Sequence, residues 1–120
     1  MSEKVIAVVD DLFFASKIRA AAQAVNVEIK FARGLQQLMA SAAESKPDLI
    51  VVDLHSQKID ALSLAQKLKT SDDLKSIPLL GFFSHVETEL QRSALEAGFD
   101  RVIPRSLFSR DLASILKEVD

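Results

Sequence analysis

An apolar segment from Pro47 to Leu54 constrains the fold of this chain more than any other feature. It opens with a Pro-Asp pair, continues through four consecutive apolar residues and then reaches Asp53. Branched side chains on both of its faces predict a strand covered by helices on either side, as in a parallel sheet. Ligands of open parallel sheets bind outside the carboxyl ends of the strands, where Asp53 would lie. Asp53 is therefore either a site residue or a strand-terminal turn former.

A regular alternation of strands and helices surrounds this segment. It predicts right-handed crossovers and an α/β fold, a doubly wound, flavodoxin-like parallel sheet of five strands in the order 2-1-3-4-5 with five helices. The predicted strands are 5–9, 27–31, 47–53, 77–83 and 99–103, of which 27–31 has the polar alternation of an edge strand. The predicted helices are 12–25, 35–43, 60–69, 87–97 and one from about 109. The expected core includes Val8, Val9, Ile50, Val51, Val52, Leu79, Leu80 and Val102.

Length and composition bound the class of protein. With 120 residues, 48% of them hydrophobic and 27% charged, the chain is expected to form one soluble globular domain over residues 1–120. A net charge of −2 provides no general attraction to nucleic acid or to anionic membranes. The absence of cysteine excludes disulfides and thiolate metal sites. No secretory signal and no apolar run of the ~20 residues that span a bilayer are present, so we expect a cytoplasmic protein.

Acidic residues follow two of the predicted buried strands. Asp10 and Asp11 come after the first strand, and Asp53 ends the third. These strands are neighbours at the topological switch point, so we expect three carboxylates in one crevice. Such carboxylates repel one another unless one is protonated or a cation such as Mg²⁺ or Mn²⁺ lies among them. Replacing Asp11 or Asp53 by Asn should then stabilise the metal-free protein. The alternative is a set of strand-end caps.

Five motifs extend this pattern over essentially the whole chain. They are Val8-Val9-Asp10-Asp11, Pro47-Asp48-Leu49-Ile50-Val51-Val52-Asp53 with Asp60 seven residues later, Ile77-Pro78, Ala97-Gly98, and Ser106-Leu107-Phe108 after the fifth strand. Together they resemble the receiver domains of two-component response regulators, in particular the single-domain type found in chemotaxis.

The resemblance implies a role for each acidic residue and for the chain. Asp53 matches the phosphoryl-accepting aspartate. Asp10 and Asp11 match the metal-binding acids, with the main-chain carbonyl of His55 as a further ligand of Mg²⁺ or Mn²⁺. Such a protein is no enzyme beyond accepting and hydrolysing its own aspartyl phosphate. Its implied partners are a sensor histidine kinase or phosphotransfer protein, and an effector bound through helix four, strand five and helix five (residues 87–97 and 101–116), with no nucleic acid or membrane.

Departures from the family pattern fall on the residues that respond to phosphorylation. The family's Lys near the end of strand five falls on Arg105, which keeps the positive charge. Arg105 is either a solvated strand-end base or, as we expect, a partner of Asp53. The Thr or Ser that ends strand four falls on Phe83, which cannot donate a hydrogen bond to a phosphoryl group. Ser84 is one residue further on and should point to the other face. The aromatic position of strand five falls on Val102. The sequence therefore predicts an intact acidic pocket and an altered switch.

Three functions are compatible with these residues. The first is a stand-alone receiver that accepts a phosphoryl group on Asp53. The second is a pseudo-receiver that binds partners regardless of phosphorylation. The third is a small Mg²⁺-dependent phosphatase with Asp53 as nucleophile, which is disfavoured because His55 stands where that chemistry needs a general acid.

Overall fold

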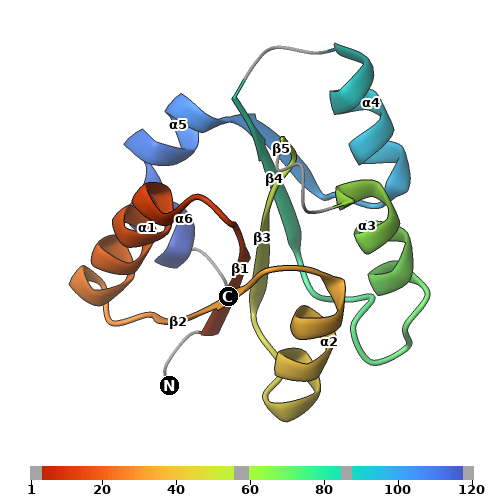
Figure 1. Cartoon of the computed structure of the whole chain (residues 1–120), viewed down its shortest axis with the longest axis horizontal. Helices are drawn as coiled ribbons and strands as arrows, with labels where there is room; N and C mark the ends of the chain where they lie inside the picture. Colours follow the sequence, from red (N-terminus) through yellow and green to blue (C-terminus); the bar gives the residue numbers. More distant parts are fainter. Residues whose placement is uncertain (1–3, 56–59, 85–87, 118–120) are drawn as a thin grey trace.

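A five-stranded parallel sheet forms the centre of the molecule in the computed structural model, which describes residues 4–55, 60–84 and 88–117. The strand order is β2-β1-β3-β4-β5, so the predicted flavodoxin-like topology is confirmed (Figure 1). The strands are β1 (Lys4–Val8), β2 (Glu28–Ala32), β3 (Leu49–Asp53), β4 (Leu79–Phe83) and β5 (Arg101–Pro104). The helices are α1 (Leu12–Ala24), α2 (Leu35–Glu44), α3 (Ala61–Lys69), α4 (Thr88–Ala97), α5 (Arg105–Arg110) and α6 (Leu112–Lys117).

Helices cover both faces of the sheet. Figure 1 shows α1, α5 and α6 on one side and α2, α3 and α4 on the other. Successive residues of β3 alternate between these layers: Leu49 and Val51 pack in the first, Ile50 and Val52 in the second. β3 and β4 are buried along their whole length. Burial on both faces explains why these two strands have almost no polar residues.

The expected core is buried with one exception. Val102 is only partly buried and packs at the margin of the layer formed by α2, α3 and α4, because β5 is an edge strand. β2, at the opposite edge, has the alternating exposure that its sequence predicted. The other expected core residues, Val8, Val9, Ile50, Val51, Val52, Leu79 and Leu80, are all buried.

The end of the chain differs from the prediction of one helix from about residue 109. Pro104, with φ −64° and ψ 147°, is an extended residue after which α5 begins at once, at Arg105. The helix is interrupted at Asp111, whose side chain binds the guanidinium of Arg110, because Asp is a weak helix former in a helix interior. The described residues therefore contain six helices rather than five. None of these helices is long and apolar enough to cross a membrane.

A glycine on β4 allows the chain to pack closely just after Asp53. The main-chain N–H of Leu54 donates to the carbonyl of Phe82 at 3.0 Å. The buried Leu54 side chain then lies over Gly81, where an added Cβ would come within 3.0 Å of Leu54 Cγ and Cδ2. Gly81 thus fixes how the segment after β3 leaves the sheet.

The change Gly81→Ala should therefore destabilise the protein by about 1–3 kcal/mol, the usual effect of overpacking a core. Urea unfolding followed by circular dichroism measures this loss. Gly34→Ala is the matched control, since a Cβ at Gly34 meets nothing within 4 Å and its φ is −178°. Equal losses in the two variants would contradict the packing role of Gly81.

Candidate functional site

Asp53 ends β3 at the carboxyl edge of the sheet. It is the one buried charged residue in the described part of the chain, with 6% of its surface exposed. Its Oδ1 accepts a hydrogen bond from the main-chain N–H of His55 at 2.9 Å. Burial raises the pKa of Asp53 and the charge of Asp10 adds to the rise, while the His55 N–H and the charge of Arg105 oppose it. Ionisation of Asp53 is therefore less favourable in the metal-free pocket than in water.

Asp10 follows β1 and lies near Asp53, because the register of the two strands aligns Val8 with Val52. Its side chain is half-buried. It also lines an open cavity of about 570 Å³ between α1, β2 and the start of α2. Asp10 therefore borders space that is open to solvent.

Asp11 has both carboxylate oxygens engaged. Oδ1 accepts the main-chain N–H groups of Phe13 at 3.0 Å and Phe14 at 3.2 Å, which caps the first turn of α1. Oδ2 accepts a hydrogen bond from Nη2 of Arg105 at 2.9 Å, forming an ion pair. The Arg105 bond, followed by the Phe14 N–H, holds the pKa of Asp11 below its ordinary value. Asp11 is thus a stabilised carboxylate, unlike Asp53.

Arg105 is the first residue of α5, and its guanidinium packs on a cluster of aromatic rings. Its Cζ lies 4.1 Å from the centroid of the Phe14 ring, a cation–π contact. The Phe14 ring is 5.1 Å from Phe82 and 5.8 Å from Phe108, measured between centroids. Phe82 and Phe108 stack at 4.9 Å. The cluster therefore joins α1, β4 and α5 beneath the guanidinium.

The expected pairing of Arg105 with Asp53 is corrected by this arrangement. The ion pair of Arg105 is with Asp11, and its positive charge acts on Asp53 through space. The cause is the early start of α5, which places the guanidinium over the first turn of α1.

The three carboxylates provide the oxygen donors that Mg²⁺ and Mn²⁺ prefer. Within residues 4–55, 60–84 and 88–117, however, no group of three or more His, Cys, Asp or Glu side chains is placed to hold a metal ion. Asp11 is already bound to Arg105 and to the first turn of α1. Asp10, Asp11 and Asp53 thus fit a divalent cation in donor type, while Oδ2 of Asp11 is already engaged by Arg105.

Two of the three residues at the switch positions, Phe83 and Val102, have no polar side chain. Phe83 is 3% exposed and packs in the layer of α2, α3 and α4, opposite the layer that contains Phe82. Ser84 is exposed, and Val102 packs beside the same layer as Phe83. A buried phenyl ring thus occupies the position of the family's hydroxyl.

Asp60 has a local role, because its Oδ1 and Oδ2 accept the N–H and the hydroxyl of Ser63 at 3.1 and 2.9 Å and cap α3. The carbonyl of His55 as a metal ligand stays a prediction. Residues 56–59 and His85 lie outside the described residues. Sequence reasoning missed the cap formed by Asp11 and the ring of Phe14 beneath Arg105. An acid directly before a predicted helix was the available signal for the cap.

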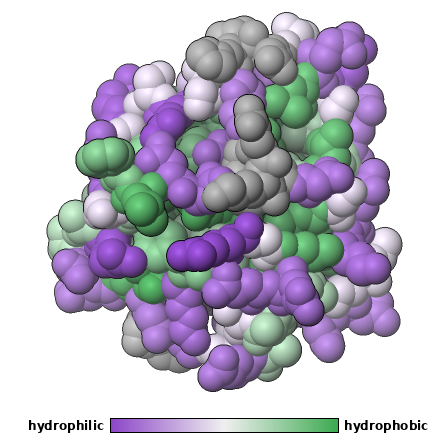
Figure 2. Space-filling view, in the orientation of Figure 1, coloured by the Kyte–Doolittle hydropathy of each residue, from purple (hydrophilic) through white to green (hydrophobic). Residues whose placement is uncertain are grey.

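Two large apolar side chains lie exposed beside the acidic pocket. Leu12 is 78% exposed and Phe13 is 92% exposed, both in the first turn of α1. Figure 2 shows hydrophobic side chains at the surface on the side where Figure 1 places α1 and α5, with polar side chains around them. Phe13 is thus turned to solvent, while the neighbouring Phe14 is buried.

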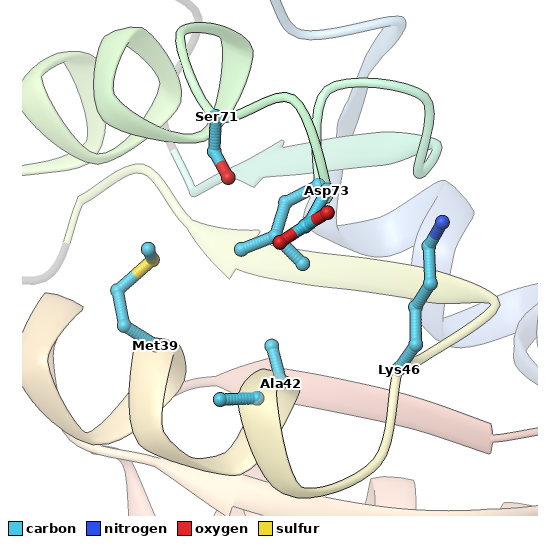
Figure 3. Close-up of a pocket in the computed structure, with 7 residues that line it drawn as sticks. Met39, Ala42, Lys46, Ser71 and Asp73 are labelled. Carbon is cyan, nitrogen blue, oxygen red and sulfur yellow. The ribbon is translucent and has the colours of Figure 1, made fainter.

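Another cavity, of about 370 Å³, lies between α2 and the segment that follows α3. Figure 3 shows the side chains of Met39 and Ala42 on one side of it and Ser71 and Asp73 on the other, with Lys46 at its edge. None of the residues of the acidic pocket lines it. The three carboxylates therefore lie at the other end of the sheet from this cavity.

The family follows from comparison with known proteins. A model described as the response regulator receiver domain matches residues 5–117. The chain belongs to this family. Receiver domains are generally signalling proteins rather than enzymes, and they interact with histidine kinases and effectors.

Individual relatives of this receiver domain show how far the similarity extends. The response regulator protein VraR of Staphylococcus aureus is 31% identical over 83 residues, which are 69% of this chain but only 39% of VraR. The chemotaxis response regulator CheY4 of Vibrio cholerae has a TM-score of 0.86 at 18% identity, with both chains fully covered. The receiver domain of the sensor histidine kinase PA1611 from Pseudomonas aeruginosa, with magnesium in its active-site cleft, has a TM-score of 0.83 at 16% identity, covering 98% and 96% of the two chains. At these identities the structural matches establish the fold.

In the metal-free receiver domain, Asp53→Asn and Asp11→Asn should change stability in opposite directions. Asn at position 53 still accepts the His55 N–H but removes a buried charge, so the melting temperature should rise by roughly 2–5 °C. Asn at position 11 still caps α1 but loses the ion pair with Arg105, so stability should fall by about 0.5–1 kcal/mol. The contacts of Asp11 thus change our expectation for Asp11→Asn from a gain to a loss of stability. Thermal melts in chelator at neutral pH measure the difference.

The pH dependence of the two effects is a control. The folded-state pKa of Asp53 is raised, so the gain from Asp53→Asn is complete above that pKa, shrinks as the pH falls through it, and vanishes where the carboxyl is protonated in both folded and unfolded states. The folded-state pKa of Asp11 is lowered, so its stabilisation is present above the unfolded pKa and is lost as the pH falls through the folded pKa. Melting temperatures that move in the same direction at neutral pH would contradict these roles.

Proposed function

We propose that this receiver domain accepts a phosphoryl group on Asp53 from a sensor histidine kinase or phosphotransfer protein. The observation that carries the proposal is the position of Asp53, a buried carboxylate at the carboxyl end of β3 with Asp10 and Arg105 acting on its charge. In the transfer, an Asp53 oxygen forms a bond to phosphorus while the bond from phosphorus to the donor nitrogen breaks. The product is an acyl phosphate.

The residues around Asp53 would bind the cation and the phosphoryl group. Asp10, Asp11 and Asp53, together with the main-chain carbonyl of His55, would hold Mg²⁺ or Mn²⁺, whose charge stabilises the transferred phosphoryl group. Arg105 would contact the phosphoryl oxygens in place of the family's Lys, since a guanidinium binds phosphate well. The open cavity at Asp10 supports this proposal, because Asp10 borders space that is open to solvent.

Two surfaces would serve the partners of this domain. The exposed Leu12 and Phe13 stand beside Asp11 and offer a docked phosphodonor an apolar contact next to the pocket. An effector would bind the surface of α4, β5 and α5, as in the family. We expect the domain to act in the cytoplasm, where receiver domains typically work. That it acts alone stays a prediction.

Acetyl phosphate with Mg²⁺ should add one phosphoryl group to the wild-type chain, detected by intact-mass spectrometry. Asp53→Asn should remove the modification, because the nucleophilic oxygen is lost, and chelation of the metal should slow it. Asp73→Asn, which changes an exposed acid remote from the pocket, is the matched control and should leave the yield unchanged. Equal labelling of Asp53→Asn and wild type would refute Asp53 as the acceptor.

Binding of beryllofluoride, a phosphoryl mimic, should leave the surface of α4, β5 and α5 nearly unchanged. A ligand shifts a conformational equilibrium only through its different affinities for the two states. With Phe83 in place of a hydroxyl, a charge-assisted hydrogen bond of ~1.5–3 kcal/mol is missing from that difference. The population shift should therefore be smaller by roughly ten- to a hundred-fold.

Amide chemical shifts with and without beryllofluoride measure this response. Shifts near Asp53 and His55 establish that the mimic has bound. Large changes across residues 88–97 and 101–116 in the same spectra would show that the domain has a switch that does not need the hydroxyl.

A further inference from the structure

Asp11 Oδ2 is the point where two positive groups would meet. In the structure this oxygen is 2.9 Å from Nη2 of Arg105. The other oxygen, Oδ1, caps α1 through the N–H groups of Phe13 and Phe14, so it is tied to the helix. A cation that recruits Asp11 must therefore use Oδ2, the atom that Arg105 already holds.

Arg105 is well suited to stay in this position. Its side chain is 33% exposed, and its guanidinium lies flat enough on Phe14 for a cation–π contact at 4.1 Å. The aromatic cluster below does not move easily, because Phe82 and Phe108 are fully buried and stacked. The ion pair also offsets some of the negative charge that Asp10, Asp11 and Asp53 bring to one end of the sheet. Arg105 thus provides a positive counter-charge to the carboxylates from within the chain.

We propose that Arg105 and a divalent cation are alternative partners of Asp11, so that Arg105 is the resting counter-ion of the pocket and must leave Asp11 before the cation binds. The inference rests on the metal part of the proposed function. A divalent cation and a guanidinium on one carboxylate oxygen would repel each other at close range. Mg²⁺ binds oxygen at about 2.0–2.1 Å and keeps several of its own waters, which compete with Nη2 for the space around the oxygen.

This exchange gives Arg105 a second position to occupy. Once the cation takes Asp11, the guanidinium is free, while its stacking on Phe14 keeps it close to the pocket. It is then available to the anionic phosphoryl group on Asp53. Cation binding would thereby prepare Arg105 for the phosphoryl group, and Arg105 acts as a positioning residue in both states.

The test is the affinity for Mn²⁺, measured from the electron paramagnetic resonance signal of the free ion. The chain has no Trp or Tyr for fluorescence. Arg105→Gln should bind Mn²⁺ about tenfold more tightly than wild type, because Asp11 no longer gives up a partner. Arg110→Gln is the matched control: it removes the same charge from an arginine that pairs with Asp111 and does not contact Asp11. It should change the affinity less than about twofold.

Two further measurements keep the result interpretable. The Nε–Hε resonance of Arg105, assigned with Arg105→Lys, should move when Mg²⁺ is added to the wild-type protein, even if Arg105→Gln does not fold. Arg105→Lys, which keeps the charge but not the planar contact, should have an intermediate affinity. An unmoved Arg105 resonance at saturating Mg²⁺, equal affinities in Arg105→Gln and Arg110→Gln, or no cation binding by any of these proteins would overturn the inference.

The titrations contain no phosphodonor, so they are independent of phosphorylation. Tighter Mn²⁺ binding by Arg105→Gln without an adduct on Asp53 would leave the exchange standing and remove the proposed phosphoacceptor. An adduct on Asp53, with no effect of Arg105→Gln on the affinity for Mn²⁺, would remove the exchange and leave the proposed phosphoacceptor standing.

Discussion

The burial of a carboxylate at the end of β3 is the constraint on which the rest of the pocket depends. Asp53 lies where water is largely excluded, and a charge in such a place is unfavourable unless other groups compensate for it. The main chain compensates through the His55 N–H, and α5 compensates through the charge of Arg105. A strand with apolar residues on both faces thus determines two features at once. It sets the order of the sheet, and it buries Asp53 where a nearby positive charge is required to offset the cost of ionisation.

Asp11 and Asp53 are both acids of one pocket, yet their environments separate them. Asp11 is part of a helix cap and an ion pair, so its charge is an element of the folded structure. Among the described residues, Asp53 accepts a hydrogen bond from the His55 N–H, is largely buried, and is affected by the charges of Asp10 and Arg105. This asymmetry suits a site that changes chemically at a single residue. Of these two acids, only Asp53 makes the fold more stable when its charge is neutralised or bound.

Much of the fold could be predicted because it depends on local periodicity. The apolar run that ends in Asp53 and the acids after β1 were sufficient to place two strands side by side and to bring their carboxylates together. The partner of Arg105 could not be predicted, because it depends on where α5 begins and on the ring that lies beneath the guanidinium. The partial exposure of Val102 was missed for a similar reason, because it follows from the position of β5 at the edge of the sheet.

The ion pair between Arg105 and Asp11 joins residues 94 positions apart in the chain. All three carboxylates are present once β3 has been synthesised, but their counter-charge arrives only with the segment after β5. A nascent chain that ends before α5 would therefore contain the acids without the arginine and the rings of the aromatic cluster without Phe108. Electrostatic balance in this domain is reached only when α5 joins α1, and completion of the pocket coincides with closure of the fold.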